Sequence, residues 1–153
     1  MGLTRRDVCI LLPALMAAAT GHAAEGREGG DQTLRSAIYD YKDLEVEKKG
    51  KDREYVPVFE GTTSDGQHMT LHESGVGPGG VVHEAYRHSG DELFLVREGT
   101  LEVEIEGKRS ELGPGSVAYV ASNTEYAVRN TSKEWTRYFV FFFGPSQPHI
   151  ERG

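Results

Sequence analysis

The chain has 153 residues, a length that fits a single domain. Its formal net charge is -7 and its pI is about 5.4, which exclude the phosphate backbone of a nucleic acid as an expected partner. Hydrophobic residues make up 37% and charged residues 27% of the chain, as in globular proteins, and its 19 glycines favour many turns between short strands.

Residues 1–23 predict an export signal. Arg5 and Arg6 form a basic start, residues 8–19 are apolar, and Gly21-His22-Ala23 places small residues where a signal peptidase cleaves. The apolar run of roughly 12 residues is short for a membrane span. Around Arg5 the sequence TRRDVCI resembles a twin-arginine signal, and a general secretory signal or an uncut anchor is the alternative. We therefore expect an exported, periplasmic protein with no membrane span after cleavage.

The remaining chain divides into a leader, a domain and a tail. Residues 24–35 are rich in glycine and charge and predict a flexible leader, residues 36–146 a β-barrel domain, and residues 147–153 a tail. In the domain, expected strands alternate with turn signals, a pattern typical of an all-β sandwich or barrel. The strands are expected at 37–44, 54–60, 67–74, 93–96, 100–106, 108–112, 116–120, 125–129 and 135–143, and a solvated loop at 46–53.

Two of these segments also indicate what covers them. In 100–106, apolar residues alternate with three glutamates, as in an antiparallel strand with one face in water. Segment 135–143 is apolar on both faces, with Phe139 and Phe141 on one and Val140 and Phe142 on the other. One face fits the domain's own core. The other would aggregate if exposed, so we predict a homodimer, with a covering loop as the alternative.

Residues 80–99 contain the main candidate functional groups. Tyr86 and His88 are two residues apart, so on an extended strand they share a face. Glu92 follows a Ser89-Gly90 turn signal and precedes the apolar run 93–96. The stretch thus brings a phenol, an imidazole and a carboxylate together, and these groups could ligate a metal or hold a polar ligand.

The same stretch matches the first of two family motifs. The motif of the cupins runs Gly, five residues, His-x-His, three or four residues, Glu, six residues, Gly. Here Gly80 is followed by five residues, Tyr86-Arg87-His88, three residues, Glu92, six residues and Gly99. The sequence therefore resembles the cupins over this stretch.

The second cupin motif runs Gly, five residues, Pro-x-Gly, two residues, His, three residues, Asn. Here Gly115 is followed by five residues, Ala121-Ser122-Asn123, two residues, Tyr126, three residues and Asn130. The resemblance covers residues 69–143 and is strongest to small single-domain bacterial cupins. It implies an antiparallel jelly-roll barrel.

The resemblance also implies a site, but with altered ligands. In metal-bearing cupins the ligands are the two His and the Glu of the first motif and the His of the second. By position these fall on Tyr86, His88, Glu92 and Tyr126, so two imidazoles are replaced by phenols. A phenol with pKa near 10 must lose a proton to ligate as phenolate, which at pH 7 opposes binding by roughly 4 kcal/mol. Fe(III) can supply that free energy.

His83 offers a further ligand. It lies three residues before Tyr86, and a bulge in its strand would bring it to the site. His83, His88 and Glu92 would then form a two-His-one-carboxylate set, which suits Fe(II). His72, on the preceding strand, is a weaker candidate. Without a metal, His88 and Glu92 form a buried ion pair whose carboxylate accepts from Tyr86 and Tyr126.

Three functional hypotheses follow. The first is an exported cupin barrel that binds a small polar or anionic molecule in its interior, at a site degenerate relative to metal-bearing cupins. The second is a metal-dependent oxygenase, isomerase or lyase that uses His88, Glu92 and His83. The third is a structural dimer with a vestigial pocket. A single Fe, Mn or Zn ion and no metal at all both remain open, and the fold alone selects no chemistry.

Overall fold

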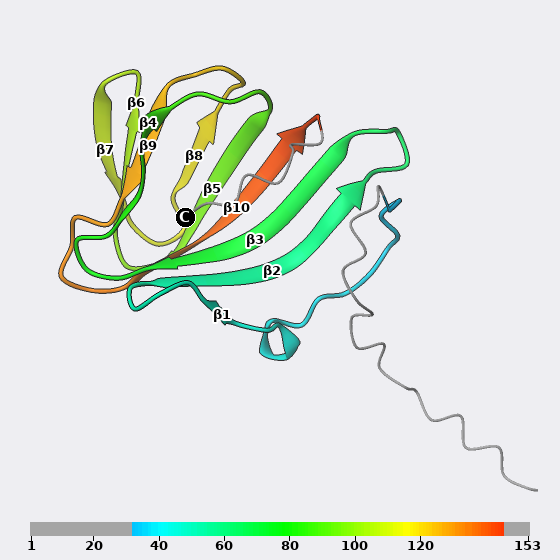
Figure 1. Cartoon of the computed structure of the whole chain (residues 1–153), viewed down its shortest axis with the longest axis horizontal. Coiled ribbons are helices and arrows are strands. Elements are labelled where there is room, and N and C mark those ends of the chain that lie inside the picture. Colours follow the sequence, from blue (N-terminus) through cyan, green and yellow to red (C-terminus); the bar gives the residue numbers. More distant parts are fainter. Residues whose placement is uncertain (1–31, 146–153) are drawn as a thin grey trace, which may run out of the picture.

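The structure is a computed structural model of the chain, and it describes residues 32–145. Apart from one 3-10 turn, η1 (Tyr41–Asp43), the regular elements within this range are strands (Figure 1). They are β1 (Glu47–Lys48), β2 (Arg53–Thr62), β3 (His68–Val76), β4 (Val81–Tyr86), β5 (Asp91–Glu98), β6 (Leu101–Ile105), β7 (Lys108–Leu112), β8 (Val117–Val120), β9 (Tyr126–Arg129) and β10 (Thr136–Gly144).

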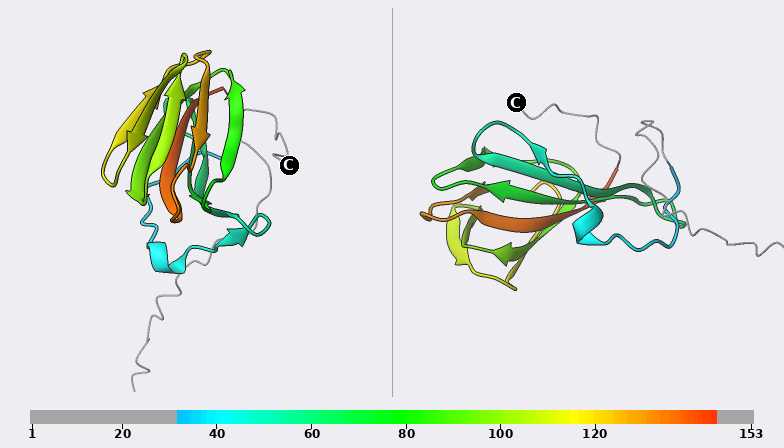
Figure 2. Two further views of the ribbon diagram at one scale, coloured as in Figure 1. Left: turned by 90° about the vertical axis from the view of Figure 1, so that its left-hand side faces the viewer. Right: turned by 90° about the horizontal axis from the view of Figure 1, so that it is seen from below.

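The strands form two antiparallel sheets that curve around a common interior (Figures 1 and 2). One sheet has the order β1-β2-β3-β10-β5-β8 and the other the order β4-β9-β6-β7. Strands distant in sequence are neighbours, as where β10 lies between β3 and β5. The expected all-β, antiparallel jelly-roll fold is therefore confirmed.

The core lies between the two sheets. Its members are Val76, Phe94, Val96, Leu101, Val103, Val120, Tyr126, Val128, Tyr138 and Val140. On β6, Leu101 and Val103 are buried, whereas Glu102 and Glu104 point to the other face and meet Arg129. The alternation of apolar and acidic residues in the sequence thus matches a strand with one buried face.

Asn130, the last residue of the second motif, is a structural residue. Its side chain is buried, and its amide nitrogen donates to the carbonyls of Val76 at 2.9 Å, Gly77 at 3.0 Å and Glu134 at 2.7 Å. Its backbone nitrogen donates to the carbonyl of Gly80 at 2.8 Å. Asn130 therefore ties the turn that precedes β4 to the turn that precedes β10, and so helps to place the strand that carries the candidate site.

The N-terminal part of the domain differs from the sequence expectation. Residues 37–44 are not a strand, because Asp40 caps η1 and Tyr41 donates its hydroxyl to Glu73 on β3, 2.7 Å away. The expected loop 46–53 contains the two-residue strand β1, which pairs with β2. Pairing begins at Thr33, which bridges to Thr62, slightly before the expected domain start.

The predicted signal, the leader up to residue 31 and the tail 147–153 lie outside the described residues. Within residues 32–145, no helix is long and apolar enough to cross a membrane.

Candidate functional site

The hydroxyl of Tyr126 is the centre of a polar cluster inside the barrel. Tyr126 is 1% exposed, and its hydroxyl donates a short hydrogen bond to Glu92 Oε2. The Tyr86 hydroxyl lies 2.9 Å from the Tyr126 hydroxyl oxygen, and His88 Nε2 lies 3.0 Å from it. The structure thus brings together the four residues that the motif positions indicate.

Both sheets contribute to this cluster. Tyr86 on β4 pairs directly with Tyr126 on β9, so the two phenols share a face of the four-stranded sheet. Glu92 comes from β5 of the six-stranded sheet, where it pairs with the buried Phe142. His88 lies just after β4, on the segment that crosses from one sheet to the other. The cluster therefore forms only when the two sheets are packed together.

The hydrogen bonds differ in one detail from the metal-free expectation. That expectation has both phenols donating to Glu92, whereas the observed bonds run from Tyr126 to Glu92 and between Tyr86 and Tyr126. His88 Nε2 is 3.5 Å from Glu92 Oε2, with side-chain exposures of 15% and 4%. His88 Nδ1 donates to the Ser89 carbonyl at 3.0 Å, which fixes the orientation of the ring.

The environment of Tyr126 keeps its phenol protonated. Burial raises the pKa of Tyr126 far above its ordinary value, and the nearby Glu92 carboxylate and Tyr86 raise it further. A tyrosinate at this position would lose its solvation and face a carboxylate. The hydroxyl therefore acts as a hydrogen-bond donor and acceptor near neutral pH.

His83 lies against the same cluster. The pairing of β4 with β9 is irregular on both sides of His83, and these irregularities put it on the same side of the strand as Tyr86, although the two are three residues apart. Its ring meets Tyr86 and Tyr126 edge to face, with centroids 4.3 and 4.9 Å away. Its Nδ1 donates to the Glu84 carbonyl at 3.1 Å.

The donor set does not fit a divalent metal as the cluster stands. Within residues 32–145, no three His, Cys, Asp or Glu side chains gather as metal ligands do. His83, His88 and Glu92 therefore do not form a ready two-His-one-carboxylate site. A cation at the centre would have to displace the Tyr126 hydroxyl from three partners, and burial opposes the phenolate that would bind it.

The opposite wall of the interior adds a residue that the sequence analysis missed. Thr70, Phe142 and Glu92 form one row across β3, β10 and β5, so their side chains share the interior face. The Phe142 ring lies between His88 and His68, with centroids 5.7 and 6.3 Å away. His68 Nδ1 is buried and has no hydrogen-bond partner within the described chain. The period-two pattern of 67–74 places His68 on the same strand face as Thr70, but the pattern gives no indication that His68 lies at the functional site. His72, the weaker candidate, stacks on Tyr55 with centroids 4.6 Å apart.

The sequence offers four arginines as candidate partners of an anionic ligand, and all four are engaged elsewhere. Each forms an ion pair with a glutamate outside the Tyr126 cluster. The pairs are Arg87 with Glu125 at 3.4 Å, Arg97 with Glu73 at 2.5 Å, Arg129 with Glu104 at 2.8 Å and Arg137 with Glu98 at 2.6 Å. These four guanidinium groups are therefore engaged away from the interior cluster, which contains the Glu92 carboxylate, and this arrangement does not favour a strongly anionic ligand.

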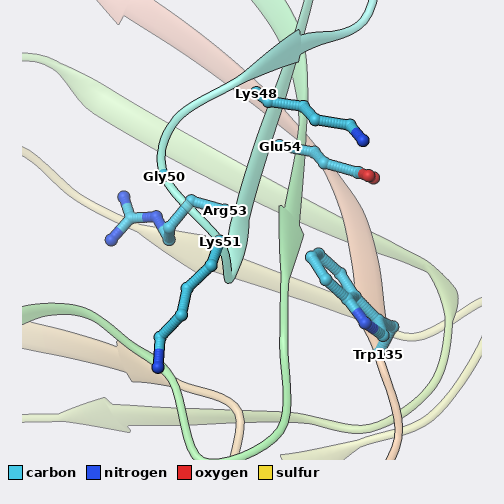
Figure 3. Close-up of a pocket in the computed structure, with 6 residues that line it drawn as sticks. All are labelled: Lys48, Gly50, Lys51, Arg53, Glu54 and Trp135. Carbon is cyan, nitrogen blue, oxygen red and sulfur yellow. The ribbon is translucent and has the colours of Figure 1, made fainter.

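A separate hollow of about 180 Å³ lies at the β1–β2 hairpin. It is lined by Lys48, Gly50, Lys51, Arg53, Glu54 and Trp135. Figure 3 shows that Lys48 and Glu54 project to the side of Trp135, whereas Arg53 and Lys51 project away from it. Glu54 is paired with Arg137 at 3.0 Å, and Arg53 donates to the carbonyls of Val81 and Val82. Because its charged groups diverge, we take the Tyr126 cluster as the functional site.

Comparison with known proteins agrees with this fold. The family model for the cupin domain matches residues 72–143. A curated relative, L-ectoine synthase from Bordetella petrii, is 31% identical over 72 residues, which are 46% of this chain and 48% of that protein. The chain thus spans about half the length of this relative.

Solved structures share the fold at low identity. KdgF from Halomonas sp. has a TM-score of 0.62 and 16% identity, with 74% of this chain and 96% of that chain covered. An RmlC-like cupin from Shewanella frigidimarina has a TM-score of 0.61 and 13% identity, with 73% and 95% covered. A predicted oxalate decarboxylase from Thermotoga maritima has a TM-score of 0.58 and 14% identity, with 71% and 99% covered. The fold and the matched region define a small jelly-roll barrel. Residues 72–143 thus match the cupin domain, and the barrel has the fold of the solved cupins.

Proposed function

We propose that this cupin binds a small polar molecule inside its barrel, at the cluster of Tyr86, His88, Glu92 and Tyr126. The observation that carries the proposal is that Tyr86, His88 and Glu92 converge on the buried hydroxyl of Tyr126. Burying this many polar groups costs free energy unless each is hydrogen-bonded. Apolar residues alone would suffice for a stable core. We therefore assign the polar cluster to ligand recognition.

The surroundings of the cluster support a ligand of low charge. Arg87, Arg97, Arg129 and Arg137 are paired with glutamates outside the cluster, and the interior carries the Glu92 carboxylate. A hydroxyl, amide or amine group on the ligand can exchange hydrogen bonds with phenols and imidazoles. His68 lies beyond the Phe142 ring, on β3. Since Glu92 and Thr70 are two strand spacings apart in the same sheet, about 10 Å, a ligand that lies across Phe142 can reach both ends of this row.

Binding can be tested even though the ligand is unidentified. The protein is isolated from its own host and examined by native mass spectrometry for a bound small molecule, which is then identified and titrated by calorimetry. Tyr86→Phe and His88→Gln are expected to weaken binding at least tenfold, because each removes a polar contact at the cluster. Arg87→Gln, which alters a surface ion pair, serves as the control and is expected to bind normally. Equal affinity in the wild type and all three variants would refute the proposal.

A metal-dependent enzyme is the second candidate, because the curated relative is a synthase and both His88 and Glu92 occupy ligand positions of the first motif. Because His83, His88 and Glu92 do not gather as metal ligands within the described chain, this candidate requires their side chains to rearrange around an ion. An ion held there would supply a Lewis acid at the cluster. Elemental analysis of the protein from its host tests this candidate, and stoichiometric Fe, Mn or Zn that is lost in His88→Ala would support it over the metal-free site.

We further propose that the protein is exported through residues 1–23. The basic pair Arg5-Arg6 followed by an apolar run supports this proposal. A reporter enzyme fused after residue 35 is expected in the periplasm, and replacement of both arginines by lysine is expected to retain it in the cytoplasm if the twin-arginine route is used. Unchanged export after this replacement would indicate the general secretory route.

A further inference from the structure

Glu60 and His68, at the β2–β3 hairpin, form a polar pair on the interior face of the six-stranded sheet. Glu60 pairs with Thr70, and His68 lies two residues before Thr70, so the three side chains share one face. That face also carries Phe142 and Glu92, which continue the row from Thr70 across β10 and β5. His68 Nε2 lies 3.6 Å from Glu60 Oε1. The register thus places two carboxylates about 14 Å apart in one interior row, with Phe142 between them.

His68 has one ring nitrogen that is buried without a hydrogen-bond partner. That atom is Nδ1, and the side chain as a whole is 11% exposed. The Glu60 carboxylate beside Nε2 favours the tautomer with its proton on Nε2, which leaves a lone pair on Nδ1. A buried acceptor costs free energy unless a donor reaches it. Within residues 32–145 no group supplies that donor, so Nδ1 is available to an N–H or O–H group of a ligand.

The groups around this nitrogen favour an ammonium group as the donor. A protonated amine can donate to His68 Nδ1 and be attracted by the Glu60 carboxylate at the same time. The Phe142 ring, with its centroid 6.3 Å from that of His68, can contact the CH₂ groups of such a ligand, and an aromatic face attracts a positive charge. A carboxylate on the ligand would instead be repelled by Glu60 and would have no proton for Nδ1.

The exposure of the interior row indicates where a ligand enters. The Glu60 side chain is 59% exposed, whereas Phe142 is 7% and Glu92 3% exposed. The β2–β3 hairpin also extends beyond the four-stranded sheet (Figure 1). Exposure therefore falls from the hairpin toward the Tyr126 cluster, and a ligand that enters at the hairpin meets Glu60 first.

We propose that Glu60 and His68 form a second recognition point, which binds a primary ammonium group of the ligand. The other end of that ligand carries an uncharged polar group for the Tyr126 cluster, and an apolar chain along Phe142 joins the two ends. The ligand class is thus an amine with a hydroxyl or amide group. This inference rests on the proposed function for the cluster end, whereas the hairpin end is supported by the His68 nitrogen and the Glu60 carboxylate.

Three probes that differ at one end test the inference: 6-amino-1-hexanol, 1,6-hexanediol and 6-hydroxyhexanoate. All three offer a hydroxyl to the Tyr126 cluster, and the other end is an ammonium, a hydroxyl or a carboxylate. NMR titrations of the full chain at about pH 8, where an alkyl amine is protonated, measure the affinities. The signals of His68 and Phe142 report binding at the hairpin. We expect the amino alcohol to bind about fivefold more tightly than the diol, and the hydroxy acid to bind most weakly.

Glu60→Gln removes the charge at the hairpin. It is expected to reduce the preference for the amino alcohol over the diol to less than about twofold, and because Glu60 is exposed the variant is expected to fold normally. Glu111→Gln is the matched control, because Glu111 is also exposed but lies on β7 of the other sheet. This control is expected to keep the full preference.

Tyr86→Phe separates this inference from the proposed function, because it alters only the cluster that all three probes share. It is expected to weaken the three probes equally. If the wild type binds all three with equal affinity and Tyr86→Phe weakens them all, the ammonium assignment is wrong while the Tyr126 cluster remains a binding site. A preference for the amino alcohol that Glu60→Gln leaves intact would overturn the inference as well, as would no binding of the amino alcohol at millimolar concentration.

Discussion

At the scale of single residues, the Tyr126 hydroxyl determines the geometry of the site. Its oxygen forms hydrogen bonds with Tyr86, His88 and Glu92. Tyr126→Phe removes this hydroxyl and leaves the buried Glu92 carboxylate without that donor. We expect a loss of about 1 to 3 kcal/mol in the free energy of unfolding, measured by urea denaturation. Tyr39→Phe, at an exposed ring, is expected to change the free energy of unfolding by less than about 0.5 kcal/mol. Equal effects of the two changes would contradict this role.

The same residue predicts a pH dependence at the alkaline end. Burial raises the pKa of Tyr126 above its ordinary value of 10.0, so the folded protein keeps a proton that the unfolded chain loses above about pH 10. The free energy of unfolding therefore falls as pH rises above 10, by at most about 1.4 kcal/mol per pH unit from this group. We expect Tyr126→Phe to show a shallower decline than the wild type between about pH 10 and pH 11.5 in pH-dependent urea melts. Parallel curves would show that Tyr126 does not contribute.

The residues of the site were predictable from spacing, but their contacts were not. The motif positions identify Tyr86, His88, Glu92 and Tyr126 because the cupin pattern preserves their separations along the chain. Which phenol meets the carboxylate depends on how two sheets pack, and no local pattern encodes that distance. His68 was missed for the same reason, since Phe142, its neighbour in space, lies far away in sequence.

At the scale of elements, the strands were predicted best where apolar and polar residues alternate. Segment 108–112 coincides with β7, and 100–106 contains β6. Residues 37–44 were wrongly predicted as a strand, because aromatic residues favour strands locally but here contact the sheet through side chains such as Tyr41. The irregular pairing of β4 brings His83 to the site. In the sequence, only the three-residue separation of His83 and Tyr86 indicated that a bulge could do so.

The turn between β5 and β6 depends on Gly99, the last residue of the first motif. Gly99 has φ of +76°, and a Cβ there would collide with the Trp135 carbonyl and with Thr136. Gly107, in the turn between β6 and β7, has φ of +79° and nothing within 4 Å of the Cβ position. Gly99→Ala adds both backbone strain and a clash, whereas Gly107→Ala adds strain alone.

We therefore expect Gly99→Ala to lower the free energy of unfolding by about 3 kcal/mol or more, and Gly107→Ala by about 1 kcal/mol. Urea denaturation of the two variants measures the difference. A similar cost at both positions would show that positive φ alone explains the glycine in the motif.

At the scale of the whole molecule, both the barrel and the need for cover on both faces of β10 were visible in the sequence. Residues 135–143 are apolar on both faces of the strand. The structure buries Tyr138, Val140 and Phe142 in the core, and Phe139 and Phe141 are half-buried on the outer face. Which strands lie beside β10 could not be predicted, because their order follows from the jelly-roll topology. The homodimer remains a prediction.

The ion pair of Glu73 and Arg97 connects the N-terminal segment to this surface. Tyr41 donates to Glu73, and the Arg97 guanidinium lies over the Tyr41 ring, 4.8 Å from its centroid. Arg97→Gln leaves a carboxylate that is 1% exposed without its cation. We expect a loss of about 2 to 3 kcal/mol in the free energy of unfolding, below the range for fully buried pairs because the Arg97 side chain is 36% exposed. Limited proteolysis within residues 36–46 is expected to become faster, since the segment loses its anchor.

The partner residue supplies the control for this prediction. In Glu73→Gln with Arg97→Gln, no unpaired charge remains, and an amide at 73 can still accept from Tyr41. We expect the double variant to recover at least half of the stability lost in Arg97→Gln, because most of that loss comes from the buried carboxylate and not from the missing guanidinium. If the loss in the double variant equalled the sum of the losses in Glu73→Gln and Arg97→Gln, the two side chains would not be coupled. The attachment of residues 36–46 would then depend on packing against Phe59 instead.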